Sequence, residues 1–520
     1  MNSVRSLPDL ARAVAETLEL ARGEPGVGEV EVFAASNAVL LARLNYTSHI
    51  PCNGVEEPKS TESFGLGVRA TFETEAGRAT GFGSEPADLS SAGGRRALAK
   101  ARRGAVVDPD FVSLPKPTRE SRTLDGYHDA RLMDVSDEAL VGAGWTIVNG
   151  GLRTFLHSPR LAELAGGESG LAALGLILGG DVTILQERIA IASSSLPRVE
   201  TDESTIVTAF VTAMVERHGS KGSGSTVGTR LDHFTDDAGT DAAMAAIDGI
   251  GGERVPSGTY TVVFGRQPVT DLINNLIVPA CTATAFHTMS TPFLGRVGRR
   301  VASPWLSVYD HGGLAGLAGS KGVTCEGLPT GRTDLIRHGI LSGCLANWYE
   351  SRRLLRDPRL GEKLGATGDA AVVALAPRNG FRFGAGGGRM FDVPPGIAAS
   401  NVIVEGADPV TRDELLRLVG DGLYIGRIWY TYPINGLRAG DFTCTVVADS
   451  YIIRNGRIAG PIRPNTIRIN DNIATFLNNV LGVTKDAKPT IVWAADEVVY
   501  APEIAVSGVR VDAIDMRRLD

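Results

Sequence analysis

The histidines are the first residues to test for chemistry, because two of them one turn apart on a helix commonly hold a catalytic zinc ion. Such a site needs three protein ligands, an open position for water and a nearby carboxylate that takes the proton from that water. No two of the eight histidines stand within five residues of each other. They are His49, His128, His157, His218, His233, His287, His311 and His338. The sequence therefore contains no helix of the H-E-x-x-x-H type, and we predict no metal ligand and no catalytic residue in this chain.

Hydroxyl and thiol nucleophiles have no local signature either. Thr288 and Ser290 follow His287, but the chain lacks the G-x-S-x-G elbow that exposes a catalytic serine. A Ser/His/Asp triad stays open, because its members need not be close in sequence. Cys325 has no basic residue within three positions that would activate its thiol, so we interpret it as an ordinary small side chain.

The most informative segment runs from Gly319 to Leu355 and reads GSKGVTCEGLPTGRTDLIRHGILSGCLANWYESRRLL. Its turn residues are Glu326, Gly327, Pro329, Thr330 and Arg332. Residues 335–341 then predict a strand, a tight turn and a second strand, and a helix with Arg352 and Arg353 follows.

This segment resembles the signature of the TldD/TldE (PmbA) family, whose members pair up as intracellular metallopeptidases. Further matching segments occur in the family's order, so the resemblance covers nearly all 520 residues. They are Gly67–Ala70, Gly77–Phe82, Gly440–Thr443 and Tyr451–Ile458. The resemblance implies an α+β fold, in which an N-terminal mixed α/β domain is followed by a β-rich C-terminal domain.

The resemblance also implies where the metal site of a catalytic member lies, which is the first helix of the second domain. Counting from Val262 and Phe264, the first His and the Glu would fall near Asn274 and Asn275, and the second His near Pro279. Asparagine is a poor zinc ligand and no general base, and proline has no side-chain donor atom. The cysteine loop that completes the family's site is not found, since Cys444 lies in a strand-like TCTVV run.

These departures favour the TldE/PmbA branch, whose members resemble the catalytic subunit but lack its metal ligands. The implied function is a non-catalytic subunit of a heterodimeric zinc metallopeptidase that acts on unfolded peptides or peptide leaders. No cofactor is expected in this chain, and zinc is expected in a TldD-type partner that carries H-E-x-x-x-H. We expect the substrate cleft near Glu326, Gly327, Arg332 and His287. Thr324-Cys325-Glu326 stands where the family commonly has Asp-Asp-Glu, so this turn departs from the family's pattern.

The composition is that of an ordinary globular protein and excludes several classes of partner. A formal net charge of −7 and a pI near 5.7 give no electrostatic footprint for nucleic acid or an anionic membrane. No apolar run approaches the roughly 18 residues that cross a bilayer, and the N-terminus lacks a signal-peptide core. The five scattered cysteines are typical of a reducing compartment, so a cytoplasmic location is predicted.

Local patterns predict the arrangement of elements along the chain. Residues 29–35 and 39–45 alternate apolar and polar side chains, which predicts a hairpin that turns at Ser36-Asn37. Strands are expected near 151–160 and 182–215, and a flexible loop at 219–230, which reads GSKGSGSTVGTR. Glycine and proline between 251 and 258 predict a boundary that divides the chain into domains 1–254 and 255–520.

The helix predicted after residue 268 has an apolar stripe with two interpretations. Leu272, Ile273, Leu276 and Ile277 recur on one face. The stripe either contacts a partner subunit or packs into its own domain, and the sequence leaves both possibilities open.

Two further functions remain open from the sequence. One is a stand-alone tailoring enzyme, a hydrolase or transferase of small-molecule or modified-peptide biosynthesis, that reuses the same fold. The other is a carrier of modified peptides without catalysis.

Overall fold

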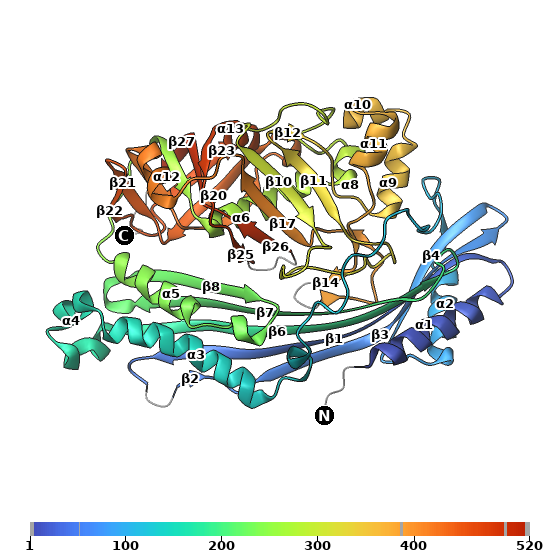
Figure 1. Ribbon diagram of the computed structural model, residues 1–520, viewed down its shortest axis with the longest axis horizontal. Coiled ribbons are helices and arrows are strands. Elements are labelled where there is room, and N and C mark those ends of the chain that lie inside the picture. Colours follow the sequence, from blue (N-terminus) through green and yellow to red (C-terminus); the bar gives the residue numbers. More distant parts are fainter. Residues whose placement is uncertain (1–4, 51–52, 385–387, 493–496, 515–520) are drawn as a thin grey trace, which may run out of the picture.

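The computed structural model describes residues 5–50, 53–384, 388–492 and 497–514. Its helices and three large sheets confirm the α+β prediction. The N-terminal part is built on one long sheet, and the C-terminal part, from residue 258 onward, lies along one face of that sheet (Figure 1).

The N-terminal sheet has eight strands, which are antiparallel wherever they pair. Its order is β5-β4-β3-β1-β6-β7-β8, with the short β2 paired to β1. The strands are β1 (Val27–Thr47), β2 (Gly54–Val55), β3 (Lys59–Thr74), β4 (Gly77–Pro86), β5 (Val106–Val107), β6 (Leu176–Ser193), β7 (Glu200–Val215) and β8 (Ser220–Gly228).

Both faces of this sheet are covered, and β1 shows how. Val32 and Ala34 point into a core shared with α1 (Leu7–Arg22) and α2 (Ser91–Arg103). Phe33 and Ala35 point to the opposite face, where they pack against Val323, Cys325, Phe381 and Phe391 of the C-terminal part. Successive strand side chains alternate between faces, so a continuously apolar run indicates a strand buried on both sides. Further helices cover the sheet toward its other end: α3 (Asp137–Leu156), α4 (Pro159–Ala165) and α5 (Asp237–Asp248).

The hairpin predicted at residues 29–45 is wrong, because β1 runs through it as one strand. Ser36 and Asn37 are buried in mid-strand and bind other parts of the chain instead of turning it. Ser36 Oγ accepts a hydrogen bond from the Arg5 N–H, and Asn37 Nδ2 donates one to the carbonyl of Arg389. Polar residues that favour turns locally are held in a strand by these distant partners.

Two further local predictions are corrected. Most of the glycine-rich segment 219–230 forms strand β8, which lies under α5. A Cβ on Gly224 would stand 1.9 Å from the carbonyl oxygen of Ala238, so the glycine allows the helix backbone to approach the strand. The strand expected at 151–160 is instead the end of α3 and the start of α4, where Gly150 fits closely against Asp236. The stretch 182–215 contains β7 and most of β6.

The C-terminal part contains a nine-stranded and a six-stranded sheet that share one apolar core. The nine-stranded sheet holds β9 (Gly258–Phe264), β18 (Gly422–Ile425), β19 (Arg427–Pro433), β20 (Asp441–Ala448), β21 (Tyr451–Arg454), β22 (Arg457–Pro461), β23 (Ile467–Asn472), β24 (Val480–Val483) and β27 (Ile504–Ala513). The six-stranded sheet holds β10 (Leu306–His311), β11 (Arg332–Arg337), β12 (Ile340–Leu341), β17 (Asn401–Gly406), β25 (Lys488–Thr490) and β26 (Val498–Ala501).

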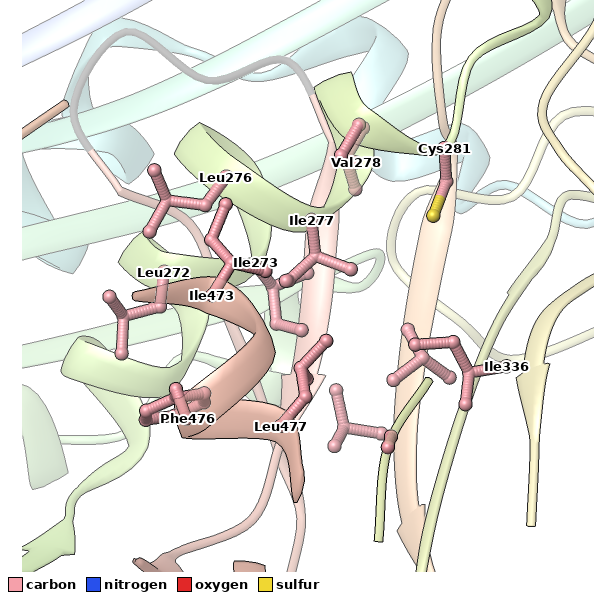
Figure 2. Packing of buried hydrophobic residues seen from close by; sticks show 14 of the residues in the cluster. Leu272, Ile273, Leu276, Ile277, Val278, Cys281, Ile336, Ile473, Phe476 and Leu477 are labelled. Atoms are coloured by element: carbon pink, nitrogen blue, oxygen red, sulfur yellow. The ribbon is translucent and has the colours of Figure 1, made fainter. Parts of the chain in front are cut away.

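The apolar stripe after β9 packs into its own domain. The helix comprises α6 (Arg266–Leu272), the π-helical turn η5 (Ile273–Ile277) and α7 (Val278–Ala280). Figure 2 shows Leu272, Ile273, Leu276 and Ile277 gathered with side chains of α13 (Ile473–Asn478). These four residues are at most 5% exposed, so the stripe belongs to the core of the C-terminal part and presents no surface to a partner.

Within the described ranges, none of the helices combines the length and apolar composition that crossing a membrane requires. Cys281, Cys325, Cys344 and Cys444 are free and buried, and Cys52 lies outside the described residues.

Candidate functional site

The helix after β9 is interrupted by a π-helical turn at its centre. The N–H of Val278 donates to the carbonyl of Ile273, five residues back, and Pro279 follows without an N–H to donate. In a regular α-helix the ring of Pro279 would meet the carbonyl of Asn275, so widening the preceding turn relieves that clash. Single π-turns of this kind are frequent at functional sites.

The face of this helix opposite the apolar stripe is polar and lies beside β19, an edge strand of the nine-stranded sheet. Gln267 binds one residue of that strand with both ends of its amide. Its Oε1 accepts from the Ile428 N–H at 2.9 Å, and its Nε2 donates to the Ile428 carbonyl at 3.2 Å. The amide of Gln267 therefore satisfies main-chain groups at the strand edge.

Asp271 stands one turn further along the same face. Burial raises the pKa of its carboxyl to about 6, although the hydroxyl of Thr431 and the amide of Asn275 lower it somewhat. Asn275 Nδ2 lies 3.2 Å from Asp271 Oδ1 and 2.9 Å from the Asp271 carbonyl oxygen. A carboxyl that titrates close to neutral pH can both take up and release a proton.

Asn274 is the least satisfied residue of this face. It is only 9% exposed, and neither its Oδ1 nor its Nδ2 has a hydrogen-bond partner in the structure. Leaving a buried polar group unpaired costs about 1–3 kcal/mol, so folding alone gives no reason for an amide here.

The donors of this helix do not fit a zinc ion. Its polar face offers one carboxylate and three amides, whereas zinc sites use Cys, His and carboxylate ligands. Cys444, on the neighbouring β20, is fully buried, and burial raises the pKa of its thiol well above the ordinary value. Throughout the part of the chain that the structure describes, no group of three or more His, Cys, Asp or Glu side chains is placed to hold a metal.

Glu326 and Gly327, predicted for the substrate cleft, lie in the contact between the N-terminal sheet and the C-terminal part. Glu326 is fully buried, and burial raises its pKa to about 7. Its Oε2 accepts a 2.8 Å hydrogen bond from the Trp348 N–H, while its Oε1 lies 3.9 Å from Arg69 Nη2 and has no hydrogen bond. Gly327 has a φ of +73°, and a Cβ there would stand 2.4 Å from a methyl group of Leu196.

Arg332 and His287 have different neighbours. The guanidinium of Arg332, on β11, lies 3.6 Å from the ring centre of Tyr309 and pairs with Asp334. His287 ends α8 (Ala283–His287), with its Nδ1 3.5 Å from Asp357 Oδ2. Burial lowers the pKa of His287, and the positive charges of Arg353 and Lys363 lower it further. The four residues predicted for the cleft therefore lie in three separate places. Glu326 and Gly327 are together, and Arg332 and His287 each lie elsewhere.

Sequence reasoning missed the polar face of the helix after β9. Its signal is visible, since polar residues at 267, 271, 274 and 275 recur at helical spacing opposite the Leu/Ile stripe. Asn274 and Asn275 were tested only as metal ligands or a general base, so this pattern was not recognised.

Comparison with known proteins agrees with this architecture. Residues 257–513 match the model of the PmbA/TldA metallopeptidase C-terminal domain. Metalloprotease PmbA of Escherichia coli O157:H7 is 25% identical over 197 residues, which span 37% of this chain and 40% of the relative. Metalloprotease slr0863 of Synechocystis is 28% identical over 191 residues, which span 36% of this chain and 34% of the relative. The chain thus matches less than half the length of either protein.

Two solved structures share the fold over nearly the whole chain. TldE from Thermococcus kodakarensis superposes with a TM-score of 0.75 at 15% identity, covering 96% of this chain and 100% of that one. A candidate modulator of a DNA gyrase from Thermotoga maritima gives 0.72 at 17% identity, covering 96% and 99%. The family-model match and the fold together define a metallopeptidase-related α+β protein. The chain belongs to the TldD/PmbA family.

Proposed function

We propose that this chain is a TldE/PmbA-like subunit without a metal site of its own. In this proposal it joins a TldD-type subunit that carries H-E-x-x-x-H, and the pair hydrolyses unfolded peptides or peptide leaders in the cytoplasm. The observation that carries the proposal is the pair Asn274 and Asn275 on the first helix of the C-terminal part, where a catalytic member of the family is expected to have a His and a Glu.

The presence of Asn274 and Asn275 in place of a His and a Glu matters because zinc-dependent peptide hydrolysis needs specific groups. The ion must bind three protein ligands and a water, and a carboxylate must take the proton as that water attacks the carbonyl. Amides supply neither function. If the family's chemistry takes place, the ligands and the general base must therefore come from another chain, with this chain shaping or holding the substrate.

The test is to purify the chain alone, the TldD-type homologue encoded in the same genome, and the two together. Elemental analysis should find no stoichiometric zinc in this chain and about one zinc per heterodimer. Cleavage of an unfolded protein should need both chains and should stop when a chelator is added. Zinc bound stoichiometrically to this chain alone, or chelator-resistant proteolysis by it, would refute the proposal.

Asp271 favours a second candidate, a stand-alone tailoring hydrolase or transferase. A buried carboxyl with a pKa near 6 beside an edge strand has the properties of a general acid or base. This candidate predicts turnover of a small-molecule or peptide substrate by the chain alone, lost in Asp271→Asn. Activity that depends wholly on the partner subunit and survives Asp271→Asn removes it.

A further inference from the structure

Strand β19 carries a run of exposed aromatic rings. Residues 429–434 read WYTYPI and contain no charged side chain. Trp429 is 39% exposed, Tyr430 69% and Tyr432 54%. A single exposed apolar residue is ordinary on a protein surface, whereas a group of neighbouring aromatic rings marks a surface that binds something.

These rings continue onto the N-terminal sheet. The guanidinium of Arg427 is buried between two of them, 5.6 Å from the ring centre of Trp429 and 5.0 Å from that of Phe210 on β7. Phe210 is itself 41% exposed, and the ring centres of Trp429 and Tyr430 are 6.3 Å apart. Arg427 therefore fixes rings from both parts of the molecule relative to one another. We call Phe210, Trp429, Tyr430 and Tyr432 the aromatic surface.

The backbone under the aromatic surface is strained at Tyr430. This residue has a φ of +57°, an unfavourable conformation for a bulky aromatic residue. The pairing of β19 with β20 also shifts between Trp429 and Tyr432. Because the ring of Tyr430 stays mostly in solvent, burial within the chain does not offset the strain. Backbone strain of this kind is concentrated at functional positions.

The main-chain edge of β19 is closed to an added strand. Gln267 already binds the outward N–H and carbonyl of Ile428, and the helix after β9 runs alongside the strand. The strand ends at Pro433, which has no N–H to donate. Covered and irregular edges of this kind prevent strand addition. The aromatic surface is therefore recognised through its side chains, which suits a folded partner better than an extended peptide.

The size of the aromatic surface also suits a folded partner. Its four rings together expose roughly 400 Å². A stable interface takes about 800 Å² from each partner, and aromatic residues are enriched in it. The aromatic surface thus supplies about half of one partner's share, as the buried centre of a subunit interface would.

We infer that the aromatic surface is the docking surface for the TldD-type subunit, with Tyr430, its most exposed ring, as a main contact. This inference rests on the proposed function and adds to it the place where the partner binds. The partner must present an apolar, uncharged face there. Arg427 acts through the rings of Phe210 and Trp429, which it holds in position.

The test measures the affinity of this chain for the TldD-type subunit encoded in the same genome. Tyr430→Asn removes the ring and installs a residue that adopts positive φ more readily. Its Kd for the partner should rise at least about thirtyfold, the effect of losing an interface hot spot. Its Tm should stay equal or rise, because the ring is exposed and the strain is relieved.

Trp429→Ala and Trp305→Ala form a matched pair. Both tryptophans lie in the C-terminal part and are similarly exposed, but only Trp429 belongs to the aromatic surface. Trp429→Ala should weaken association at least about tenfold, and Trp305→Ala should leave the Kd unchanged. Hydroxyl-radical footprinting needs no variant to fold. In the unmutated chain, oxidation of Tyr430 and Tyr432 should fall when the partner binds, while that of Trp305 stays the same.

An unchanged Kd in Tyr430→Asn, or unchanged oxidation of the two tyrosines in the complex, overturns the inference. The proposed function then still stands if the heterodimer forms and cleaves. Two other occupants would also overturn it. In one case Tyr430→Asn dissociates a homodimer of this chain, and in the other it weakens binding of a labelled unstructured peptide, both without changing the Kd for the partner. If the unmutated chains do not associate, the proposed function fails together with the inference.

Discussion

Arg389 and Asp202 join the two parts of the molecule through a buried ion pair. Nη1 of Arg389, on β15 (Gly388–Arg389), donates a 2.7 Å hydrogen bond to Oδ2 of Asp202 on β7, and both side chains are inaccessible to solvent. Lys321 pairs with Glu187 beside them, and Arg122 reaches Asp202 at 2.9 Å. These five charges compensate one another where the C-terminal part sits on the N-terminal sheet, so this network fixes how the two parts are placed.

Arg389→Met should lower the free energy of unfolding by about 3–5 kcal/mol, because it leaves the carboxylate of Asp202 and that of Glu187 short of a buried partner. Urea denaturation followed by tryptophan fluorescence measures the loss. The control is Arg359→Met, which breaks the exposed pair with Glu362 and should cost less than about 1 kcal/mol. Equal losses in the two variants would mean that burial of the network does not matter.

Asp271→Asn should change the pH dependence of stability. The carboxyl has a pKa of about 6 in the folded chain, against an ordinary value of 3.8. Between these values the folded state binds more protons, so the free energy of unfolding falls as pH rises from about 4 to 6 and is then level. Asparagine does not ionise, so the variant does not lose this stability as the pH rises. The variant should match the unmutated protein at pH 4 and exceed it by roughly 3 kcal/mol at most at pH 7. If the free energies of unfolding of the variant and of the unmutated protein differ by the same amount at every pH in this range, Asp271 is not buried.

Gly224→Ala should destabilise the N-terminal part by about 1–3 kcal/mol, because the new methyl group would lie against the Ala238 carbonyl of α5. Gly142→Ala is the control in the same part of the chain. A Cβ at Gly142, inside α3, meets no atom within 4 Å, so alanine should be neutral or stabilise by up to about 1 kcal/mol. Thermal unfolding of the two variants gives the comparison, and a stable Gly224→Ala would show that β8 and α5 are not in close contact.

The sequence by itself determined those elements whose rules are local. Thr411 and Glu414 form both hydrogen bonds of the capping box that begins α12 (Arg412–Val419). Asn455 and Gly456, an Asn-Gly pair of the kind that favours tight hairpin turns, adopt positive φ values in the turn between β21 and β22. His338 and Gly339 turn the chain between β11 and β12 in the same way. Each outcome depends on atoms within a few residues, so the pattern alone was sufficient.

The tertiary structure decided the elements whose partners lie far along the chain. Ser36 and Asn37 favour a turn locally, yet Arg389 and neighbouring strands hold them in β1. The glycines of β8 look flexible in the sequence, and only the approach of α5 requires them. The helix after β9 shows the same division. The sequence left open whether its apolar stripe contacts a partner or packs into its own domain, and the structure buries the stripe in the core of its own domain. Whether an amide on its other face is paired, like Gln267, or free, like Asn274, depends on where β19 passes, and no local rule contains that position.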